Sequence, residues 1–206
     1  FTVASNDETV AVTDVASLLD KMIVKLETGL DKAKTLSGGI IPTFLYYEAT
    51  KHEALLENGQ AKVGNYGLPL ARVKAFKLHV LPRFLEAPAR FLKTSTDMAA
   101  NLDSYNKINQ TGIYDQTLGQ FKTSECLDEM SMEIGRARAF TNGWLERESN
   151  FLHMNYKYLL GLLKSGMHSE FYEEIKTNLI CFMDPSVYGR SILENSSFIA
   201  PTCNPD

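Results

Sequence analysis

Residues 13–36 read TDVASLLDKMIVKLETGLDKAKTL, and this stretch sets the expectation for the whole fold. Its apolar side chains recur three and four residues apart, as they do along one face of an α-helix: Val15, Leu18, Leu19, Met22, Ile23, Leu26 and Leu30. Asp14 can cap the start of such a helix, and Gly38-Gly39 can end it. The pattern therefore predicts a helix over 13–36.

Helical spacing extends outward from this stretch through most of the chain, while the period-two alternation of exposed strands is almost absent. We expect further helices over 42–58, 69–106, 124–140, 144–163 and 169–183. Pro82 and Pro88 should kink or divide the longest of them. The predicted fold is therefore all-α, an irregular bundle of five to seven helices with an extended C-terminal tail tethered by a disulfide.

Length and composition indicate an ordinary globular protein. The chain has 206 residues, of which 44% are hydrophobic and 22% charged, enough for one domain with its own core. We predict a single helical domain over 1–206, with a flexible N-terminus over 1–12 and an irregular tail over 184–206. The net charge of −4 argues against nucleic acid as a partner. No run approaches the roughly 18 apolar residues of a transmembrane segment.

Two N-glycosylation sequons and three late cysteines point to the secretory route. Asn109-Gln110-Thr111 and Asn195-Ser196-Ser197 both match the acceptor pattern. The chain opens with Phe1 and no initiator methionine, as a mature chain does after loss of its signal peptide, although a shortened chain would begin in the same way. We predict a secreted glycoprotein with glycans at Asn109 and Asn195. A cytosolic protein with free thiols is the alternative.

Cys126, Cys181 and Cys203 allow one disulfide and leave one free thiol. If the helices predicted over 124–140 and 169–183 run in the same direction, Cys126 lies at the start of one and Cys181 near the end of the other. That separation exceeds the roughly 7 Å between Cα atoms that a disulfide spans. We therefore predict a Cys181–Cys203 bond that tethers the tail, and pairing of Cys126 with Cys203 stays open.

Motifs for catalysis or metal binding are missing from the sequence. His52-Glu53 resembles the start of a zinc-protease helix, but Leu56 stands where the second histidine is required. The cysteines form no C-x-x-C pair. The chain contains no nucleophile elbow, P-loop or dinucleotide fingerprint. We expect no cofactor and no metal, and an enzyme is the least favoured class of function.

A basic stretch between Arg72 and Lys93 is the one unusual cluster, with six cations and one anion. If it is helical, His79, Arg83 and Arg90 fall on one stripe, with Phe84 on the apolar side. Such a stripe suits an anionic head group. The competing interpretation is that the apolar side is core and the cations pair with acidic helices nearby.

These patterns predict a secreted, non-enzymatic binding protein for an apolar or amphiphilic, lipid-like small ligand. The expected ligand-binding residues are His79, Arg83, Phe84 and Arg90, and the expected ligand is an apolar or anionic amphiphilic molecule. The alternative is a secreted or surface protein–protein interaction domain, such as a helical ligand, antigen or effector. An internal cavity would favour the first hypothesis, and an exposed apolar patch of roughly several hundred Å² would favour the second.

Overall fold

The fold is mixed, which corrects the all-α prediction. In the computed structural model, 45% of the described residues are helical and 20% are in strands or bridges. The structure describes residues 9–188, 198–199 and 201–203, so Asn195 lies outside the described residues. The chain divides into two compact units, 1–41 and 42–206. The single domain over 1–206 therefore stays a prediction.

The first unit contains helix α1 (Val12–Leu36), which confirms the helix predicted over 13–36. Its last turn is closed by the backbone N–H of Ser37, which donates to the carbonyls of Ala33 and Lys34. Gly38 and Gly39 follow with φ of 73° and 92°, a conformation that glycine adopts without strain. α1 has no buried residue. None of the described helices combines the length and apolarity needed to cross a membrane.

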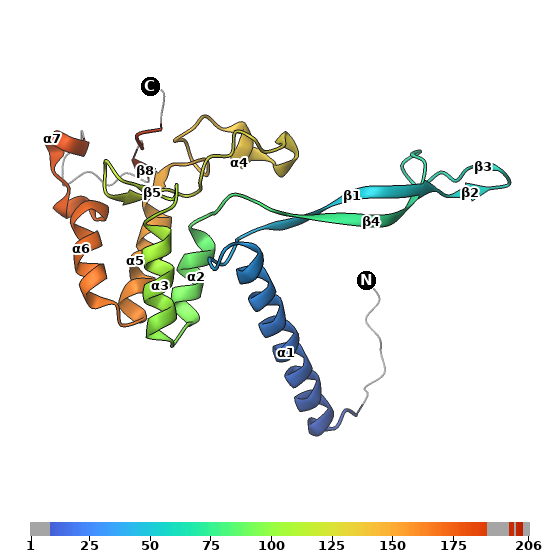
Figure 1. The fold of residues 1–206 in the computed structure, drawn as a ribbon, viewed down its shortest axis with the longest axis horizontal. Helices are drawn as coiled ribbons and strands as arrows, with labels where there is room; N and C mark the ends of the chain where they lie inside the picture. The colour runs from blue at the N-terminus through green and yellow to red at the C-terminus, as the bar shows by residue number, and fades with distance from the viewer. Residues whose placement is uncertain (1–8, 189–197, 200, 204–206) are drawn as a thin grey trace. The chain divides into compact units, whose positions relative to one another are not determined.

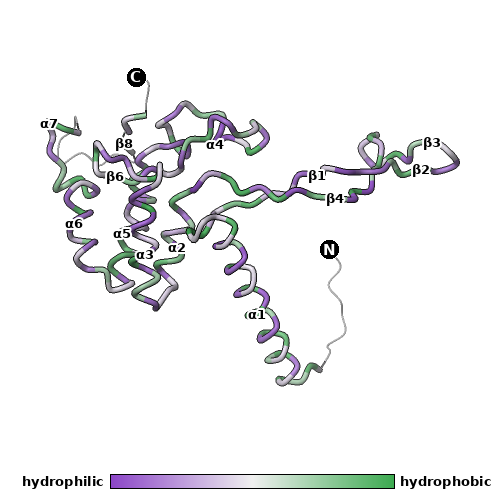
Figure 2. Tube along the Cα trace, in the orientation of Figure 1, coloured by the Kyte–Doolittle hydropathy of each residue, from purple (hydrophilic) through white to green (hydrophobic). Residues whose placement is uncertain are grey.

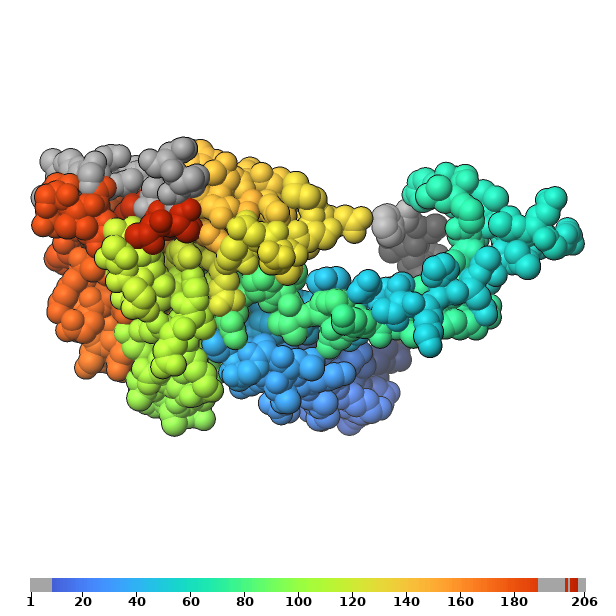
Figure 3. Space-filling view, turned by 45° about the horizontal axis from the view of Figure 1, so that its top comes forward, coloured from blue at the N-terminus to red at the C-terminus, as the bar shows by residue number. Residues whose placement is uncertain are grey.

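The second unit begins with a long two-stranded ribbon where helices were predicted. β1 (Leu45–Ala54) pairs antiparallel with β4 (Ala71–Val80), from Leu45 opposite Val80 to Ala54 opposite Ala71. Two short strands, β2 (Leu56–Glu57) and β3 (Gln60–Ala61), continue it toward the tip. The ribbon extends well beyond the helical part of the unit (Figures 1 and 3).

Local sequence explains the ribbon once strand chemistry is considered. Residues 76–80 read FKLHV, a strict alternation of apolar and polar side chains. Asn58-Gly59 joins β2 to β3 with φ of 54° and 80°, the two positive values that a two-residue hairpin turn requires. These signals outweigh the weaker three-and-four spacing that predicts helices over 42–58 and over the first part of 69–106. Because 71–80 is a strand, the basic helical stripe does not form.

Four helices build the core of the second unit: α2 (Glu86–Thr94), α3 (Met98–Ile108), α5 (Leu152–Lys164) and α6 (His168–Asn178). α5 packs against both α2 and α6 (Figure 1). Gly161 permits the close approach of α5 to α2, because a Cβ there would lie 3.1 Å from the Cβ of Leu92. Pro88 is accommodated in the first turn of α2, where its missing N–H costs no helical hydrogen bond. Buried side chains include Leu85, Ile108, Phe121, Tyr158 and Leu162.

The prediction of a helix over 124–140 is wrong. That segment is a loop with two short turns of helix, η1 (Met132–Ile134) and α4 (Arg136–Ala139). The buried guanidinium of Arg147 organises it by donating to the carbonyls of Arg138 and Phe140, both at 2.7 Å. Positive φ at Leu145 and Glu148 breaks the helix predicted from 144, so α5 starts only at Leu152.

The described part of the tail is held by hydrogen bonds. After η2 (Ile180–Phe182) and α7 (Pro185–Tyr188), β8 (Phe198–Ile199) pairs with β7 (Asn150–Phe151). A second small sheet joins β5 (Tyr114–Asp115) to β6 (Gln120–Phe121). The Asp115 carboxylate accepts from the backbone N–H and the hydroxyl of Thr202, both at 2.8 Å. Burial by itself would raise the pKa of Asp115. These bonds and the backbone N–H groups of Leu118 and Thr117 outweigh it, so the pKa lies below its usual value.

The predicted Cys181–Cys203 disulfide is also wrong, since all three cysteines are free thiols. Cys181 is exposed in η2, and the Cys203 thiol faces the carbonyl oxygen of Glu148 at 3.9 Å. Burial raises the pKa of Cys203 to about 12, which keeps this thiol protonated. The pairing had been argued from antiparallel helices that included 124–140, and that helix does not exist.

Candidate binding groove

A groove lies at the base of the ribbon, where its strands approach the 131–137 segment. The cavity there has a volume of about 520 Å³. Aromatic and aliphatic side chains dominate the ribbon side, and η1 and α4 form the other side. The lining residues are Phe44, Leu45, Tyr46, Leu81, Phe84, Ser131, Glu133, Ile134, Arg136 and Ala137.

A second cavity of about 330 Å³ adjoins the first and shares four of its residues, Phe44, Phe84, Arg136 and Ala137. Its other lining residues are Glu86 of α2, Thr123, Glu146, Phe151 of the strand before α5, and His153 and Met154 of α5 itself. We call the two cavities together the root groove. Phe44 is 48% exposed, so the root groove is open to solvent.

Phe84 is fixed in the wall of the root groove by the backbone on either side of it. The N–H of Leu85 donates to the carbonyl of Thr123 at 3.0 Å, and the N–H of Glu125 donates to the carbonyl of Arg83 at 2.9 Å. Leu85 is fully buried in the core, while the neighbouring Phe84 lines both cavities.

Phe44 completes the aromatic wall. Its ring meets that of Phe84 edge to face, with centroids 5.3 Å apart and planes at 87°, an arrangement that the charge distribution of aromatic rings favours. The adjacent Thr43 hydroxyl donates to the carbonyl of Phe84 at 3.2 Å and accepts from the N–H of Ala87 at 3.3 Å. These bonds tie the start of the ribbon to the start of α2.

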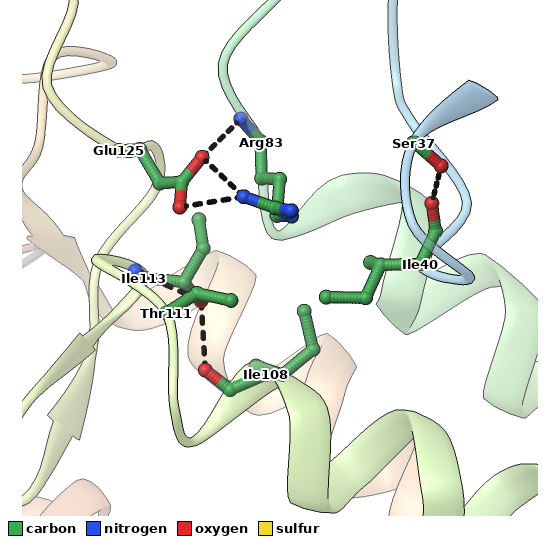
Figure 4. Close-up of polar contacts among 7 residues, drawn as sticks. All are labelled: Ser37, Ile40, Arg83, Ile108, Thr111, Ile113 and Glu125. Atoms are coloured by element: carbon green, nitrogen blue, oxygen red, sulfur yellow. Dashed lines mark hydrogen bonds and ion pairs between the residues drawn. The ribbon is translucent and has the colours of Figure 1, made fainter. Parts of the chain in front are cut away.

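Arg83 and Arg90, which were predicted to bind a ligand, do not line the root groove. Arg83 is held by Glu125: its backbone N–H donates to Oε2 at 2.8 Å, and its Nη1 donates to Oε1 and Oε2 at 3.1 and 3.2 Å (Figure 4). Arg90 donates to Glu86 on the same face of α2, with Nη2 2.7 Å from Oε1. Each arginine is therefore neutralised by a carboxylate.

The four residues predicted to bind a ligand are dispersed. Only Phe84 lines the root groove. Arg90 borders a separate cavity of about 130 Å³ beside Lys93. His79 lies on the ribbon, where its ring stacks on Tyr46 with centroids 4.7 Å apart and its Nε2 is 2.8 Å from Oε2 of Glu48.

The charged side chains around the root groove are mainly acidic. Three glutamates, Glu86, Glu133 and Glu146, line it together with one arginine, Arg136. Arg136 itself pairs with Glu146. Glu86 pairs with Arg90, so among these groups the Glu133 carboxylate supplies the net charge, which is unfavourable for an anion entering the root groove.

Sequence reasoning missed most of these residues. Arg136 and Ala137 were assigned to a helix, and no motif marks them as part of a site. Phe44 stands at the start of a predicted helix that is in fact the entry to a strand. The described residues also contain no group of three or more His, Cys, Asp or Glu side chains that could hold a metal.

The sequon at Asn109 occupies a restricted position. Asn109 follows the last residue of α3, and its Oδ1 is buried without a hydrogen-bond partner. Burial raises the pKa of Tyr105 and of Glu174, and a hydrogen bond to the Asn109 side chain offsets part of each increase. Attachment of a glycan would require this side chain to leave that position, so glycosylation there stays a prediction.

Comparisons with known proteins do not assign the chain to a family. No family model, no curated protein and no solved structure matches it. Its function is therefore argued from the root groove and from the exposed surfaces of the two units.

Proposed function

We propose that this chain is a non-enzymatic binding protein that holds a neutral, apolar small molecule in the root groove. The observation that carries the proposal is the aromatic wall of Phe44 and Phe84, which borders two adjoining cavities of about 520 and 330 Å³. Small-molecule sites typically have volumes of about 300–1,000 Å³ and mostly apolar linings. An elongated apolar molecule would contact both cavities across this wall.

The charges favour a neutral ligand over an anionic one. Arg83 and Arg90, the cations expected to meet an acidic head group, are paired with Glu125 and Glu86. Releasing either arginine would leave its carboxylate without a partner, which costs free energy. The ligand is accordingly expected to bind through its apolar surface, with selectivity set by the shape of the root groove.

Binding of the neutral dye N-phenyl-1-naphthylamine tests this proposal. Wild-type protein should bind the dye saturably, with increased fluorescence. Ala137→Trp places a large side chain in both cavities and should weaken binding by about tenfold or more, equivalent to about 1.4 kcal/mol. Ala139→Trp is the matched control, because Ala139 is exposed on the same short helix α4 and lines neither cavity.

Two outcomes of the dye experiment would count against the proposal. One is the absence of saturable binding, and the other is an equal loss of affinity in the Ala137 and Ala139 variants. The anionic dye 1-anilinonaphthalene-8-sulfonate should bind the root groove more weakly than the neutral dye, because the lining arginine is already paired with Glu146 and the Glu133 carboxylate repels an anion.

A second candidate function, protein–protein interaction, is favoured by the ribbon. Residues directly opposite each other in an antiparallel pair share a face, and three such pairs near the base are apolar: Leu45–Val80, Tyr47–Leu78 and Ala49–Phe76. We call these six residues the apolar ribbon face. Tyr47 is 63% and Phe76 59% exposed. An isolated two-stranded hairpin is marginally stable in water, so a partner covering this face would stabilise the ribbon. Secretion remains a prediction from the sequence.

A further inference from the structure

A small cavity between α2 and α5 is bordered by three cations. Its volume is about 130 Å³, and its charged lining residues are Arg90, Lys93, Lys157 and a single carboxylate, Glu86. These groups leave a net charge of +2 at the cavity, although the whole chain has a net charge of −4. We call this cavity the cationic pocket.

Helix geometry brings the four charged side chains together. Glu86, Arg90 and Lys93 follow one another at intervals of four and three residues on α2, so they share one face. On α5, Lys157 precedes Gly161 by four residues, and both line the cationic pocket. The α5 tube contains hydrophilic as well as hydrophobic segments (Figure 2). Because Gly161 permits the close approach of the two helices, lysines from both of them reach one cavity.

The two lysines carry the charge that is not compensated. Arg90 is held by Glu86, whose Oε1 accepts from Nε at 3.0 Å and from Nη2 at 2.7 Å. Within the part of the chain that the structure describes, neither Lys93 nor Lys157 forms an ion pair. Two unpaired ammonium groups beside one cavity repel each other, and an anion between them would turn this repulsion into attraction.

A phosphoryl group matches this arrangement in charge and in hydrogen bonding. It carries roughly two negative charges at pH 7 and three acceptor oxygens, and each lysine ammonium has three N–H donors. A carboxylate carries only one negative charge and would leave one of the two lysines uncompensated. The remaining lining includes the apolar side chains of Met154 and Leu160, which could contact a carbon substituent on the phosphate.

We propose that the cationic pocket binds a phosphoryl dianion between Lys93 and Lys157, as inorganic phosphate or as the phosphate group of a small monoester. Glu86 and Met154 also line the smaller cavity of the root groove, but neither lysine lines the root groove. The proposal is therefore independent of the neutral ligand, and substitutions of the lysines leave the lining of the root groove unchanged.

Calorimetric titration of the full chain with inorganic phosphate tests the proposal. Low ionic strength is used, because salt screens exposed charges. Wild-type protein should bind phosphate saturably. Lys93→Gln and Lys157→Gln should each raise the dissociation constant by about fivefold, and the double variant should raise it by about tenfold or more.

Lys164→Gln is the matched control. Lys164 is an exposed lysine on the same helix as Lys157, but it does not line the cationic pocket. The substitution removes the same charge and should change the dissociation constant by less than about twofold. Thermal unfolding checks that all variants are folded, and the double variant should still bind the neutral dye as wild type does.

Phenyl phosphate distinguishes the two sources of the phosphoryl group. Its ring would contact Met154 and Leu160 if the cationic pocket accepts a monoester. Binding at least about fivefold tighter than that of inorganic phosphate, about 1 kcal/mol, would assign the pocket to monoesters. Equal or weaker binding of phenyl phosphate would assign it to free phosphate.

Two results would overturn the proposal. One is a dissociation constant for phosphate above about 10 mM in the wild-type protein. The other is an equal loss of affinity in Lys93→Gln, Lys157→Gln and Lys164→Gln, because the anion would then respond to the overall charge of the chain and not to the cationic pocket.

Discussion

Glu174 of α6 is a buried carboxyl group in the core of the second unit. Its side chain is 5% exposed, and the Tyr105 hydroxyl donates to its Oε1 at 2.6 Å. Burial raises the pKa of Glu174, and hydrogen bonds from Tyr105 and Asn109 lower it by less. The same contact raises the pKa of Tyr105, where burial is the largest cause. The neutral form of Glu174 is therefore the one that the folded protein favours.

This pKa shift predicts how stability depends on pH. Because the folded-state pKa lies above the ordinary value of 4.5, the contribution of Glu174 to stability is complete below pH 4.5. It is lost as the pH rises through the folded-state pKa. Glu174→Gln keeps an acceptor for Tyr105 and cannot ionise. Its stability relative to wild type, measured by thermal unfolding, should increase as the pH rises from about 4 to about 8.

Glu173→Gln is the control, because Glu173 is its exposed neighbour and pairs with Lys176 at the surface. Its effect on the unfolding temperature should be small and should not show the same increase with pH. A difference between Glu174→Gln and wild type that stays constant over this pH range would contradict the assignment of a raised pKa to Glu174.

Individual site residues were predictable only where the prediction did not depend on the type of element. Phe84 was chosen as an apolar residue beside cations, and it does line the root groove. His79, Arg83 and Arg90 were grouped by helical spacing, and that grouping disappears because His79 belongs to a strand and Arg83 to an extended segment. A spacing argument is valid only within one continuous element.

Among the elements, helices with clear apolar stripes and glycine stops were predictable. α1, α5 and α6 match predicted helices over much of their length, and Gly166 ends α5 as expected. The ribbon was missed although Asn58-Gly59 is a strong hairpin signal, because the pair was interpreted as a helix end. The 124–140 loop could not be predicted, since its conformation depends on Arg147, a residue outside it.

The apolar ribbon face leads to a prediction at the scale of one element. Phe76 and Lys77 are adjacent but lie on opposite faces of β4. If a partner protein binds the apolar face, a photo-reactive residue at position 76 should crosslink to it about tenfold or more efficiently than one at position 77. Photo-crosslinking from positions 76 and 77, in extracts of the natural source, measures this difference. Equal crosslinking from both positions would eliminate the apolar ribbon face as a binding surface.

At the scale of the whole molecule, packing is concentrated in the second unit. Leu85, Phe121 and Tyr158 are fully buried in it, whereas α1 buries no residue. Cooperative unfolding follows from shared buried contacts. The second unit should therefore carry the main unfolding transition.

A fragment comprising residues 42–206 tests this division of roles. It retains the core helices, the ribbon and the root groove, so its unfolding temperature should stay within about 4 °C of the full chain, the shift that ~1 kcal/mol produces at this size. It should also bind the neutral dye as the full chain does. A fragment that fails to fold would show that α1 is part of a single cooperative structure.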